Sequence, residues 1–507
     1  MKLGLFSSSR WKAGGFADSA HFRAFLAAAL FAAAACFSHV HQGSLWVDSV
    51  RYAHIAHLAE QSGTWFPLYD EFKDAQYHNK PPLLLWLVAI SYKCFGVSSF
   101  SARLPAAIFV FCGLLLLWKV VARYYSHRAA YVALFLFCAN RVFLRGIIDL
   151  NFEGMILCAA LLCLPRFLNA IRGEALSQRD LLLFGCGLLL LLQSKPPYIF
   201  FLLFPMLVLG AIDARLRDSF VKLATSKITI GFFLLGLSWL LLSGKVEIQR
   251  MLSNQIAHPL TIEKNYWTNL SRWMRAVFLE FAPLSWVGLL ALRAQLRGAP
   301  CGPAASARLE RIFYLAWLAP AAGVILLVEH QSRYLILPFL TLTIFGANYL
   351  AALCSRVRSR HFAVFCKGSS VACFAAFCVF GLRAHTDNGA VSILRKHPEL
   401  VGSPVAVCVR GEDNISSKPT RKRMIMLLEL EFAQKFPVAM YQTIGRQKIA
   451  PGSVFIAEKE CLRLLTEHST ILTVLESKRG FSLVRLDSEL PEITRSGEDD
   501  SAFHAYH

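Results

Sequence analysis

The sequence predicts a polytopic α-helical membrane protein with about eleven transmembrane helices, external interfacial helices and a small C-terminal α/β domain. Hydrophobic residues make up 55% of the 507 residues and charged residues only 17%, which is outside the range of an ordinary soluble domain. Long apolar runs recur along most of the chain. The short loops between these runs alternate between densely and sparsely basic, as in multi-pass membrane proteins.

The formal net charge of +20 would suggest a nucleic acid partner in a soluble chain, but its position argues otherwise. From Arg383 onward the chain carries 17 Lys and Arg against 16 Asp and Glu, so nearly all of the excess belongs to the apolar part. We therefore expect membrane lipids, and no nucleic acid, among the partners.

The 14 cysteines lie mostly inside apolar runs, where a thiol behaves as a small hydrophobic side chain. No C-x-x-C pair and no Cys/His spacing typical of a metal site occurs, so we expect neither a metal nor a cofactor. Cys408 and Cys461 could pair if the C-terminal region is extracytoplasmic, and the sequence leaves this open.

Residues 1–22 are predicted to form a cytoplasmic N-terminal segment, because Lys2, Arg10 and Lys12 precede the first apolar run at 25–37 and a basic flank stays in the cytoplasm. The alternative is a cleaved signal peptide, since the small residues at 32–36 resemble a cleavage site.

Ten further apolar runs can cross a bilayer, the shortest with the help of flanking residues. They lie at 103–121, 129–144, 150–168, 181–193, 198–212, 228–242, 273–292, 312–328, 334–353 and 362–382. The run at 82–95 is short and bounded by Lys80 and Lys93, which favours an interfacial helix.

The most basic loops all fall on the N-terminal side of the membrane in this eleven-span arrangement. They lie at 119–128, 166–179, 215–227, 293–311 and 356–360. By the positive-inside rule this side is cytoplasmic. The chain is then a multi-pass protein of the cell inner (plasma) membrane, with a membrane domain at 23–382, an external loop at 41–102 and an extracytoplasmic domain at 383–507. Within the last domain, strand patterns at 405–409, 454–457 and 482–486 alternate with helical patterns at 421–434 and 459–466.

The external loop contains two groups of candidate functional residues. Asp48, Arg51 and Tyr52 are spaced i, i+3 and i+4 and share one face of a helix, although a simple surface ion pair would use the same spacing. Lys80 precedes two prolines that keep its backbone extended. It could present its charge to a ligand, or it could be an interfacial lysine that reaches for the headgroups.

Three further candidates lie at the mouths of predicted spans on the same side. Asp149 is an acid beside a span, and such acids are functional or paired, here with Arg145. Glu153, one turn deeper, is the less favoured acid. Lys195 precedes Pro196 and Pro197 and so repeats the chemistry of Lys80.

Arg333 and Tyr334 open a later span. Basic residues at such places can simply anchor a helix end at the headgroups. The position of these charges on one side of the membrane nevertheless suits a lipid phosphate, because cations at the interface neutralise charge on a departing phosphate. A nearby carboxylate can take the proton of an incoming hydroxyl.

These parts fit the transfer of a sugar from a polyprenyl-phosphate donor to a hydroxyl on a lipid, glycan or protein acceptor. Two other interpretations stay open. A polytopic transporter or lipid flippase would carry charged groups near the bilayer midplane on broken helices. A sensor would bind its ligand through the C-terminal region, and the external charges would then be incidental.

The same residues fall into motifs that follow one another along the chain. They are D-x-x-R-Y at 48–52, W-x-P at 65–67, Y-x-x-K-P-P at 77–82, F-G at 95–96, R-L-P at 103–105, K-P-P at 195–197 and R-Y-x-x-x-P at 333–338. Their order and topology resemble the membrane glycosyltransferases of the C-type fold, within them the bacterial aminoarabinose transferases and the protein O-mannosyltransferases.

The resemblance implies that Asp48 activates or orients the acceptor and that Asp149 is a second external acid. It implies an inverting transfer with no obligatory metal. Ser49 stands where many relatives have Glu, so we expect Asp48 to be the single essential acid of its loop. The substrate-binding candidates, with Arg51 and Lys80 near the donor phosphate and Arg333 and Tyr334 at the donor end, are Arg51, Tyr52, Tyr77, Lys80, Lys195, Arg333 and Tyr334.

Overall fold

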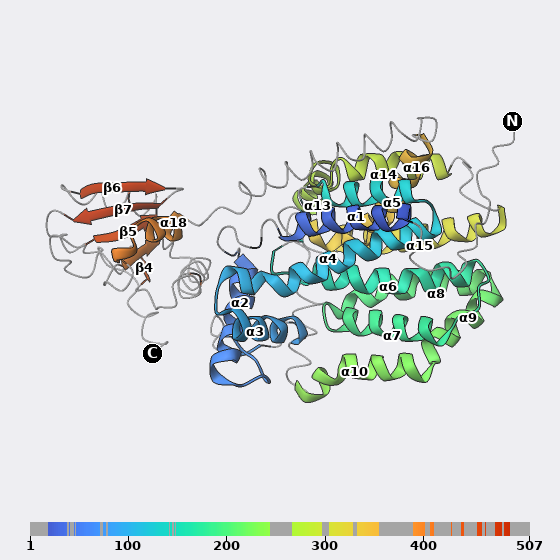
Figure 1. Ribbon diagram of the computed structural model, residues 1–507, viewed down its shortest axis with the longest axis horizontal. Coiled ribbons are helices and arrows are strands. Elements are labelled where there is room, and N and C mark those ends of the chain that lie inside the picture. Colours follow the sequence, from blue (N-terminus) through green and yellow to red (C-terminus); the bar gives the residue numbers. More distant parts are fainter. Residues whose placement is uncertain are drawn as a thin grey trace.

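The computed structural model describes most of the membrane part of the chain and the strands of its C-terminal region (Figure 1). The described residues are 19–37, 40, 45, 47–70, 75–77, 80–140, 142, 143, 147, 149–243, 266–296, 304–327, 332–353, 389–400, 406–409, 427, 438–440, 454–458, 462, 472–478 and 481–486. The N-terminal segment up to residue 18, the predicted span at 362–382, Arg145 and Cys461 lie outside these residues.

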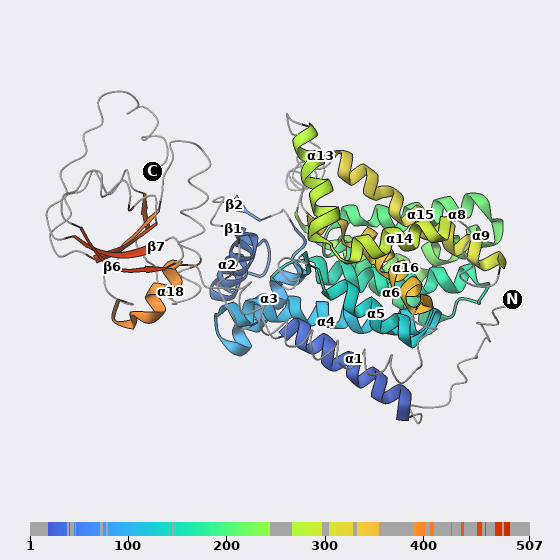
Figure 2. The same cartoon turned by 90° about the horizontal axis from the view of Figure 1, so that it is seen from above.

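Most of the long helices lie side by side with roughly parallel axes (Figure 1). In chain order these are α1 (Ser19–Phe37), α4 (Ser99–Tyr124), α5 (His127–Cys138), α6 (Glu153–Ile171), α7 (Gln178–Leu192), α8 (Ile199–Ile212), α10 (Lys227–Ser243), α14 (Leu284–Leu296), α15 (Ala304–Leu327) and α16 (Ile336–Leu353). Helix α6 is surrounded by its neighbours, since 94% of its apolar stretch is buried inside the protein. Figure 2 shows α1 along one edge of the bundle, beside α4 and α5.

Three helical stretches among the described residues are long and apolar enough to cross a membrane alone. They are Ser99–Tyr124, Glu153–Ile171 and Ser332–Leu353. Two bent pairs, Ala214–Thr225 with Lys227–Trp239 and Trp267–Glu280 with Leu284–Ala294, qualify together and bend by 53° and 92°. Several other apolar helices have only 10–17 residues. The chain is therefore a helical membrane protein, and the number of eleven spans stays a prediction.

The predicted span at 273–292 differs from the structure, which breaks it. Helix α13 (Tyr266–Arg275) continues into a single π-helical turn, η4 (Ala276–Glu280), and α14 begins after Pro283. Proline has no N–H to donate and clashes with the preceding turn of a helix. The apolar pattern runs through this proline, which is why hydropathy alone predicted one continuous helix.

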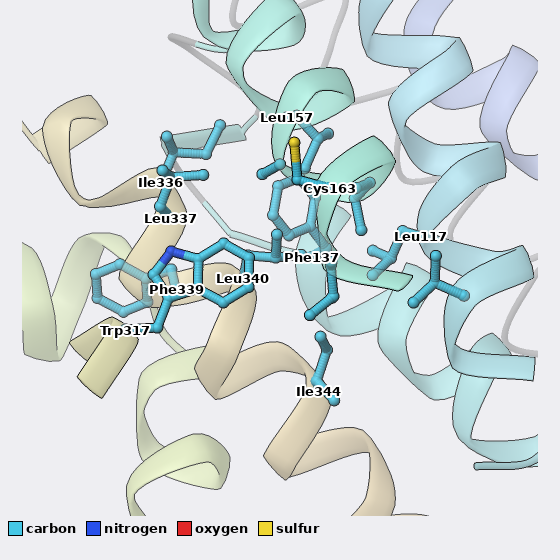
Figure 3. Packing of buried hydrophobic residues seen from close by; sticks show 14 of the residues in the cluster. Leu117, Phe137, Leu157, Cys163, Trp317, Ile336, Leu337, Phe339, Leu340 and Ile344 are labelled. Atoms are coloured by element: carbon cyan, nitrogen blue, oxygen red, sulfur yellow. The ribbon is translucent and has the colours of Figure 1, made fainter. Parts of the chain in front are cut away.

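Close packing in the bundle depends on small residues. Figure 3 shows side chains of several helices, among them Leu117, Phe137, Cys163 and Phe339, filling the space between them. At Gly187 of α7 a Cβ atom would lie 2.7 Å from the Cys163 sulfur and 2.9 Å from a backbone oxygen of α6. Only glycine lets the two helices approach this closely, as is typical of packed membrane helices.

One end of the bundle carries the external loop predicted from the sequence. It contains α2 (Val47–Ser62), α3 (Leu83–Phe95) and the short strands β1 (Tyr69–Asp70) and β2 (Ala75–Gln76). Helix α3 has 13 residues, which is about 20 Å at 1.5 Å per residue and too short to cross a bilayer. At the opposite end lies the amphipathic helix α9 (Ala214–Thr225), which carries Arg215, Arg217 and Lys222 of the basic loop 215–227 (Figure 1).

The C-terminal region contains a five-stranded mixed sheet of order β4-β3-β5-β7-β6. Its strands are β3 (Ala406–Val409), β4 (Val438–Met440), β5 (Val454–Glu458), β6 (Leu472–Lys478) and β7 (Phe481–Leu486). Strand β3 is parallel to β4 and β5, and the other pairings are antiparallel. Helix α18 (Gly389–Lys396) packs on β6 and β7, followed by the 3₁₀ turn η7 (Pro398–Leu400). The three strands expected from the sequence are present, and the domain boundaries stay predictions.

Candidate active site

Arg333 links three parts of the chain that meet at the α2 end of the bundle. It lies in the 3₁₀ turn η5 (Ser332–Leu335), just before α16. Its Nη2 donates to Oδ2 of Asp48 and its Nη1 donates to Oδ1 of Asn151, both at 2.7 Å. Its Nε lies 3.8 Å from Oε1 of Glu153. One guanidinium therefore joins the start of α2, the start of α6 and the start of α16.

Lys195 precedes the 3₁₀ turn η2 (Pro196–Tyr198), and its ammonium is buried against Glu153. Its Nζ donates to Oε1 of Glu153 at 2.6 Å, and the two side chains are 8% and 1% exposed. The same Nζ lies 4.9 Å from the ring centroid of Tyr334 and 5.9 Å from that of Tyr198, within the range of cation–π attraction. Burial lowers the pKa of Lys195 and Glu153 opposes that shift. These inward contacts do not match a lysine that only anchors a helix at the headgroups.

Lys80 differs from these two cations because, within the described part of the chain, it makes no hydrogen bond or ion pair. Its side chain is partly buried before α3. Burial, and next the charge of Lys195, lower the pKa of Lys80 to about 7. The charges of Glu153, Arg333 and Asp48 also act on it, so Lys80 lies within electrostatic reach of the same cluster. Its ammonium can therefore donate to an incoming anion.

Arg51 and the tyrosines lie beside this cluster. The Nε of Arg51 donates to Oδ2 of Asp70 at 3.0 Å, and its guanidinium lies 5.6 Å from the ring centroid of Tyr77. The hydroxyl of Tyr77 is buried and has no hydrogen-bond partner among the described residues. Burial raises the pKa of Tyr77, so its hydroxyl stays protonated and can donate to a ligand. Tyr52 packs edge to face on Phe152 at 5.4 Å.

Asp149 is held in a buried clamp between α4 and α2. The Nε of Arg103 donates to Oδ1 of Asp149 at 2.9 Å, and Oγ of Ser49 donates to Oδ2 at 2.9 Å. The Ser49 hydroxyl also lies 3.2 Å from the carbonyl oxygen of Leu150. The Arg103 and Asp149 side chains are 1% and 2% exposed. Both carboxylate oxygens of Asp149 are therefore already bonded within the protein.

The short run 149–154 organises these contacts. Asp149 bonds α4 and α2, Asn151 bonds Arg333, and Glu153 bonds Lys195. A Cβ at Gly154 would lie 3.0 Å from the backbone nitrogen of Val110 in α4, so glycine allows the helices to meet here.

The sequence patterns give little or no indication that four of these contact residues belong to the site. From the sequence, Glu153 is the less favoured acid, Arg103 is only part of a motif, and Asn151 and Asp70 belong to no candidate pattern. The available signal was the alternation of polar residues at 149, 151 and 153 directly before an apolar helix.

The cluster contains three cations, Lys80, Lys195 and Arg333, around two carboxylates, Asp48 and Glu153. With Lys80 protonated the cations exceed the carboxylates by one. A phosphate diester, which carries one negative charge, would balance this excess. Among the described residues, no group of three or more His, Cys, Asp or Glu is placed to hold a metal ion.

The helical bundle with this cluster at its mouth has the fold of a membrane glycosyltransferase of the C-type. The solved structure of ArnT from Cupriavidus metallidurans bound to undecaprenyl phosphate is similar to this chain with a TM-score of 0.57 and 13% identity. The similarity covers 92% of this chain and 98% of that one. The structure of the same protein in the apo state gives a TM-score of 0.56 with 14% identity, covering 92% and 97%.

Sequence comparison narrows the resemblance to particular families. Residues 79–241 match the family model of the dolichyl-phosphate-mannose-protein mannosyltransferases. Two proteins named undecaprenyl phosphate-alpha-4-amino-4-deoxy-L-arabinose arabinosyl transferase also match this chain. The one from Shewanella sediminis is 34% identical over 94 residues, which are 18% of this chain and 17% of the relative. The one from Pseudomonas savastanoi pv. phaseolicola is 32% identical over 83 residues, 16% and 15% of the two chains.

These matches confirm the resemblance to the aminoarabinose transferases and protein mannosyltransferases that the motifs indicated. The aligned segments span less than a fifth of each curated relative.

Proposed function

We propose that this protein is an enzyme that moves a sugar from a polyprenyl phosphate to an acceptor hydroxyl at the external face of the membrane. The observation that carries the proposal is the convergence of Lys80, Lys195 and Arg333 with Asp48 at the ends of the helices. Cations there can bind the donor phosphate while Asp48 meets the acceptor. The matched relatives are named as transferases that use undecaprenyl phosphate, which supports the same chemistry.

In the proposed reaction the acceptor oxygen attacks the anomeric carbon of the donor sugar. A new carbon–oxygen bond forms as the bond between that carbon and the phosphate oxygen breaks, and the electron pair leaves with the phosphate. The proton of the acceptor hydroxyl passes to the Asp48 carboxylate. Attack from the side opposite the phosphate inverts the anomeric carbon. Lys80, Lys195 and Arg333 stabilise the charge that grows on the departing polyprenyl phosphate.

The tyrosines and Arg51 have supporting roles in this proposal. The ring of Tyr334 packs on the Lys195 ammonium and lines the donor end. The buried hydroxyl of Tyr77 has no partner among the described residues and can donate to the donor phosphate or sugar. Arg51 lies over Tyr77, and Tyr52 is held against Phe152, so both shape the wall beside the phosphate.

Asp149 has a different role in this proposal from that of Asp48. Because both of its oxygens bond within the protein, we propose that it positions the start of α2 and does not touch the substrate. Ser49, which bonds Asp149, is the neighbour of Asp48 in the chain. The clamp therefore fixes the backbone from which Asp48 projects.

The names of the curated relatives make undecaprenyl phosphate the first lipid carrier to test and 4-amino-4-deoxy-L-arabinose the first sugar. Among the possible acceptors, lipids are to be tested first, and glycans and proteins after them. We further propose an inner-membrane location with 23–382 as the membrane domain and 383–507 as an extracytoplasmic domain.

A transporter or flippase is the alternative function, and the placement of the charges argues against it. Glu153 is the first residue of α6, Lys195 precedes η2 and Arg333 precedes α16. These charges lie at helix ends, whereas transport sites lie near the bilayer midplane. The sensor interpretation is tested by removing residues 383–507, since sugar transfer by the shortened chain would leave it without support.

The experiment that tests the proposal is a transfer assay with the purified protein in lipid nanodiscs. Radiolabelled undecaprenyl-phosphate sugars are supplied with envelope lipids, glycans or peptides, and labelled acceptors are separated and counted. Mass spectrometry of lipid-linked sugars in a deletion strain identifies the donor that accumulates. A purified, folded protein that transfers label from none of these donors would contradict the proposal.

A further inference from the structure

The partners of Arg333 differ in their access to solvent. The side chain of Glu153 is 1% exposed and that of Arg333 is 22% exposed. Asp48, with 37% of its side chain exposed, is the most accessible of the charged partners. Contacts to Asn151 and Glu153 thus hold the guanidinium from the interior side, while Nη2 holds Asp48 on the open side.

The contact between Arg333 and Asp48 conflicts with the roles of both residues in the transfer reaction. An oxygen of Asp48 that accepts a hydrogen bond from Arg333 at 2.7 Å is less available to an acceptor hydroxyl. A guanidinium group bonded to a carboxylate is likewise less available to phosphate, because both anions bind the same fork of N–H donors.

We propose that Arg333 exchanges Asp48 for the donor phosphate, so that donor binding frees the catalytic base. This inference rests on the proposed function. The bond from Nη1 to Asn151 keeps the guanidinium in place while Nη2 changes its acceptor. Lys195 and Arg333 share the Glu153 carboxylate, and the charges of Lys80 and Arg333 act on each other, so both lysines attract the phosphate to that position. The negative charge of the phosphate then replaces that of Asp48 as the counter-charge of Arg333.

The exchange sets the order in which the two substrates are engaged, with the donor before the acceptor. Without donor, Oδ2 of Asp48 is bonded to Arg333 and is not available to the acceptor hydroxyl. With donor bound, Asp48 is released next to the anomeric carbon. The acceptor is therefore activated only when a sugar is present to receive it.

A double-mutant cycle on binding of undecaprenyl phosphate tests the exchange without any turnover. Four proteins in nanodiscs are compared, namely wild type, Asp48→Asn, Arg333→Gln and the double variant. We expect Asp48→Asn to bind about two- to fivefold more tightly than wild type, which is the range of a partly exposed ion pair. In the Arg333→Gln background the same substitution should give no gain, because no guanidinium is left to release.

Two results would overturn the exchange while leaving the proposed function intact. One is an Asp48→Asn variant that binds no more tightly than wild type. The other is an equal gain in both backgrounds, which would mean that removing any nearby negative charge helps phosphate binding. A wild-type protein that does not bind undecaprenyl phosphate would instead refute the proposed function, and the exchange with it.

A structure of the wild-type protein with undecaprenyl phosphate gives an independent test that needs no variant to fold. We expect Nη2 of Arg333 to contact a phosphate oxygen and to lie beyond ion-pair distance, about 4 Å, from Asp48. A retained contact of 2.7 Å between Nη2 and Asp48 with phosphate bound would overturn the exchange.

Discussion

Replacing Arg103 with methionine tests whether Asp149 positions the site or takes part in the chemistry. The two side chains are 1% and 2% exposed and their ion pair is 2.9 Å long. Methionine removes the cation and leaves the Asp149 charge with the Ser49 hydroxyl. Removal of one partner from a buried ion pair costs about 3–5 kcal/mol. We expect Arg103→Met to lower the free energy of unfolding by that amount and to reduce transfer, since Asp149 is then no longer fixed to α4 and holds the start of α2 less firmly.

Removing both charges distinguishes the two roles of Asp149. In the double variant Arg103→Met with Asp149→Asn no charge is buried alone, so the cost of an unpaired buried charge is removed, and the amide oxygen at position 149 can still accept from the Ser49 hydroxyl. We expect it to recover most of the lost stability, and with it sugar transfer. Stability is measured by thermal unfolding of the purified protein, and transfer with the radiolabelled donor. A matched control is Arg123→Met, whose pair with Glu174 is 3.6 Å long and about half exposed, so its stability should change by less than about 1 kcal/mol.

Two outcomes would refute this reasoning. If Arg103→Met is as stable as the Arg123→Met control, the buried clamp does not support the fold. If the double variant is as stable as wild type but transfers no sugar, Asp149 takes part in the reaction itself.

Two further predictions follow from Lys80 and from the packing of α7. Since the pKa of Lys80 is lowered to about 7 and phosphate binds the protonated amine, donor affinity should be highest below pH 7 and fall by up to about tenfold per pH unit above it. Lys80→Arg should abolish this fall, because arginine stays charged. A wild-type donor affinity that does not change between pH 6 and pH 9 would contradict the phosphate-binding role of Lys80. Gly187→Ala should destabilise the bundle by about 1–3 kcal/mol through overpacking, whereas Gly231→Ala, with nothing within 4 Å of the added carbon, should not destabilise it. Equal thermal stability of the two variants would show that α6 and α7 are not closely packed there.

Hydropathy predicted the helical bundle, because apolar helices of sufficient length cross the membrane. Loop charge predicted that the candidate residues share one side of it, because basic loops stay on the cytoplasmic side. The structure brings Asp48, Lys80, Lys195 and Arg333 into one cluster. Their pairing could not be predicted, since Arg333 bonds Asp48 over 285 residues and only packed helices bring them together. The break at Pro283 was missed because the run remains apolar through the proline.

Buried polar contacts were the least predictable part of the site. The sequence favours a functional role for Asp149 and offers a pair with Arg145 as the alternative. Arg145 is close in sequence and lies outside the described residues, whereas the observed partner Arg103 comes from another helix. Glu153, one turn deeper than Asp149 in the predicted span, is the less favoured acid in the sequence. In the structure that depth is what makes Glu153 a buried counter-charge for Lys195. Spacing along one helix does not reveal which neighbouring helix supplies the opposite charge.

The most direct test of the central claim is the transfer rate of Asp48→Asn with undecaprenyl-phosphate sugar in nanodiscs. The variant should fold, insert and still bind undecaprenyl phosphate, because Lys80, Lys195 and Arg333 are unchanged. Its transfer rate should fall at least about hundredfold, as expected for loss of a general base. Transfer by Asp48→Asn at the wild-type rate would contradict the account.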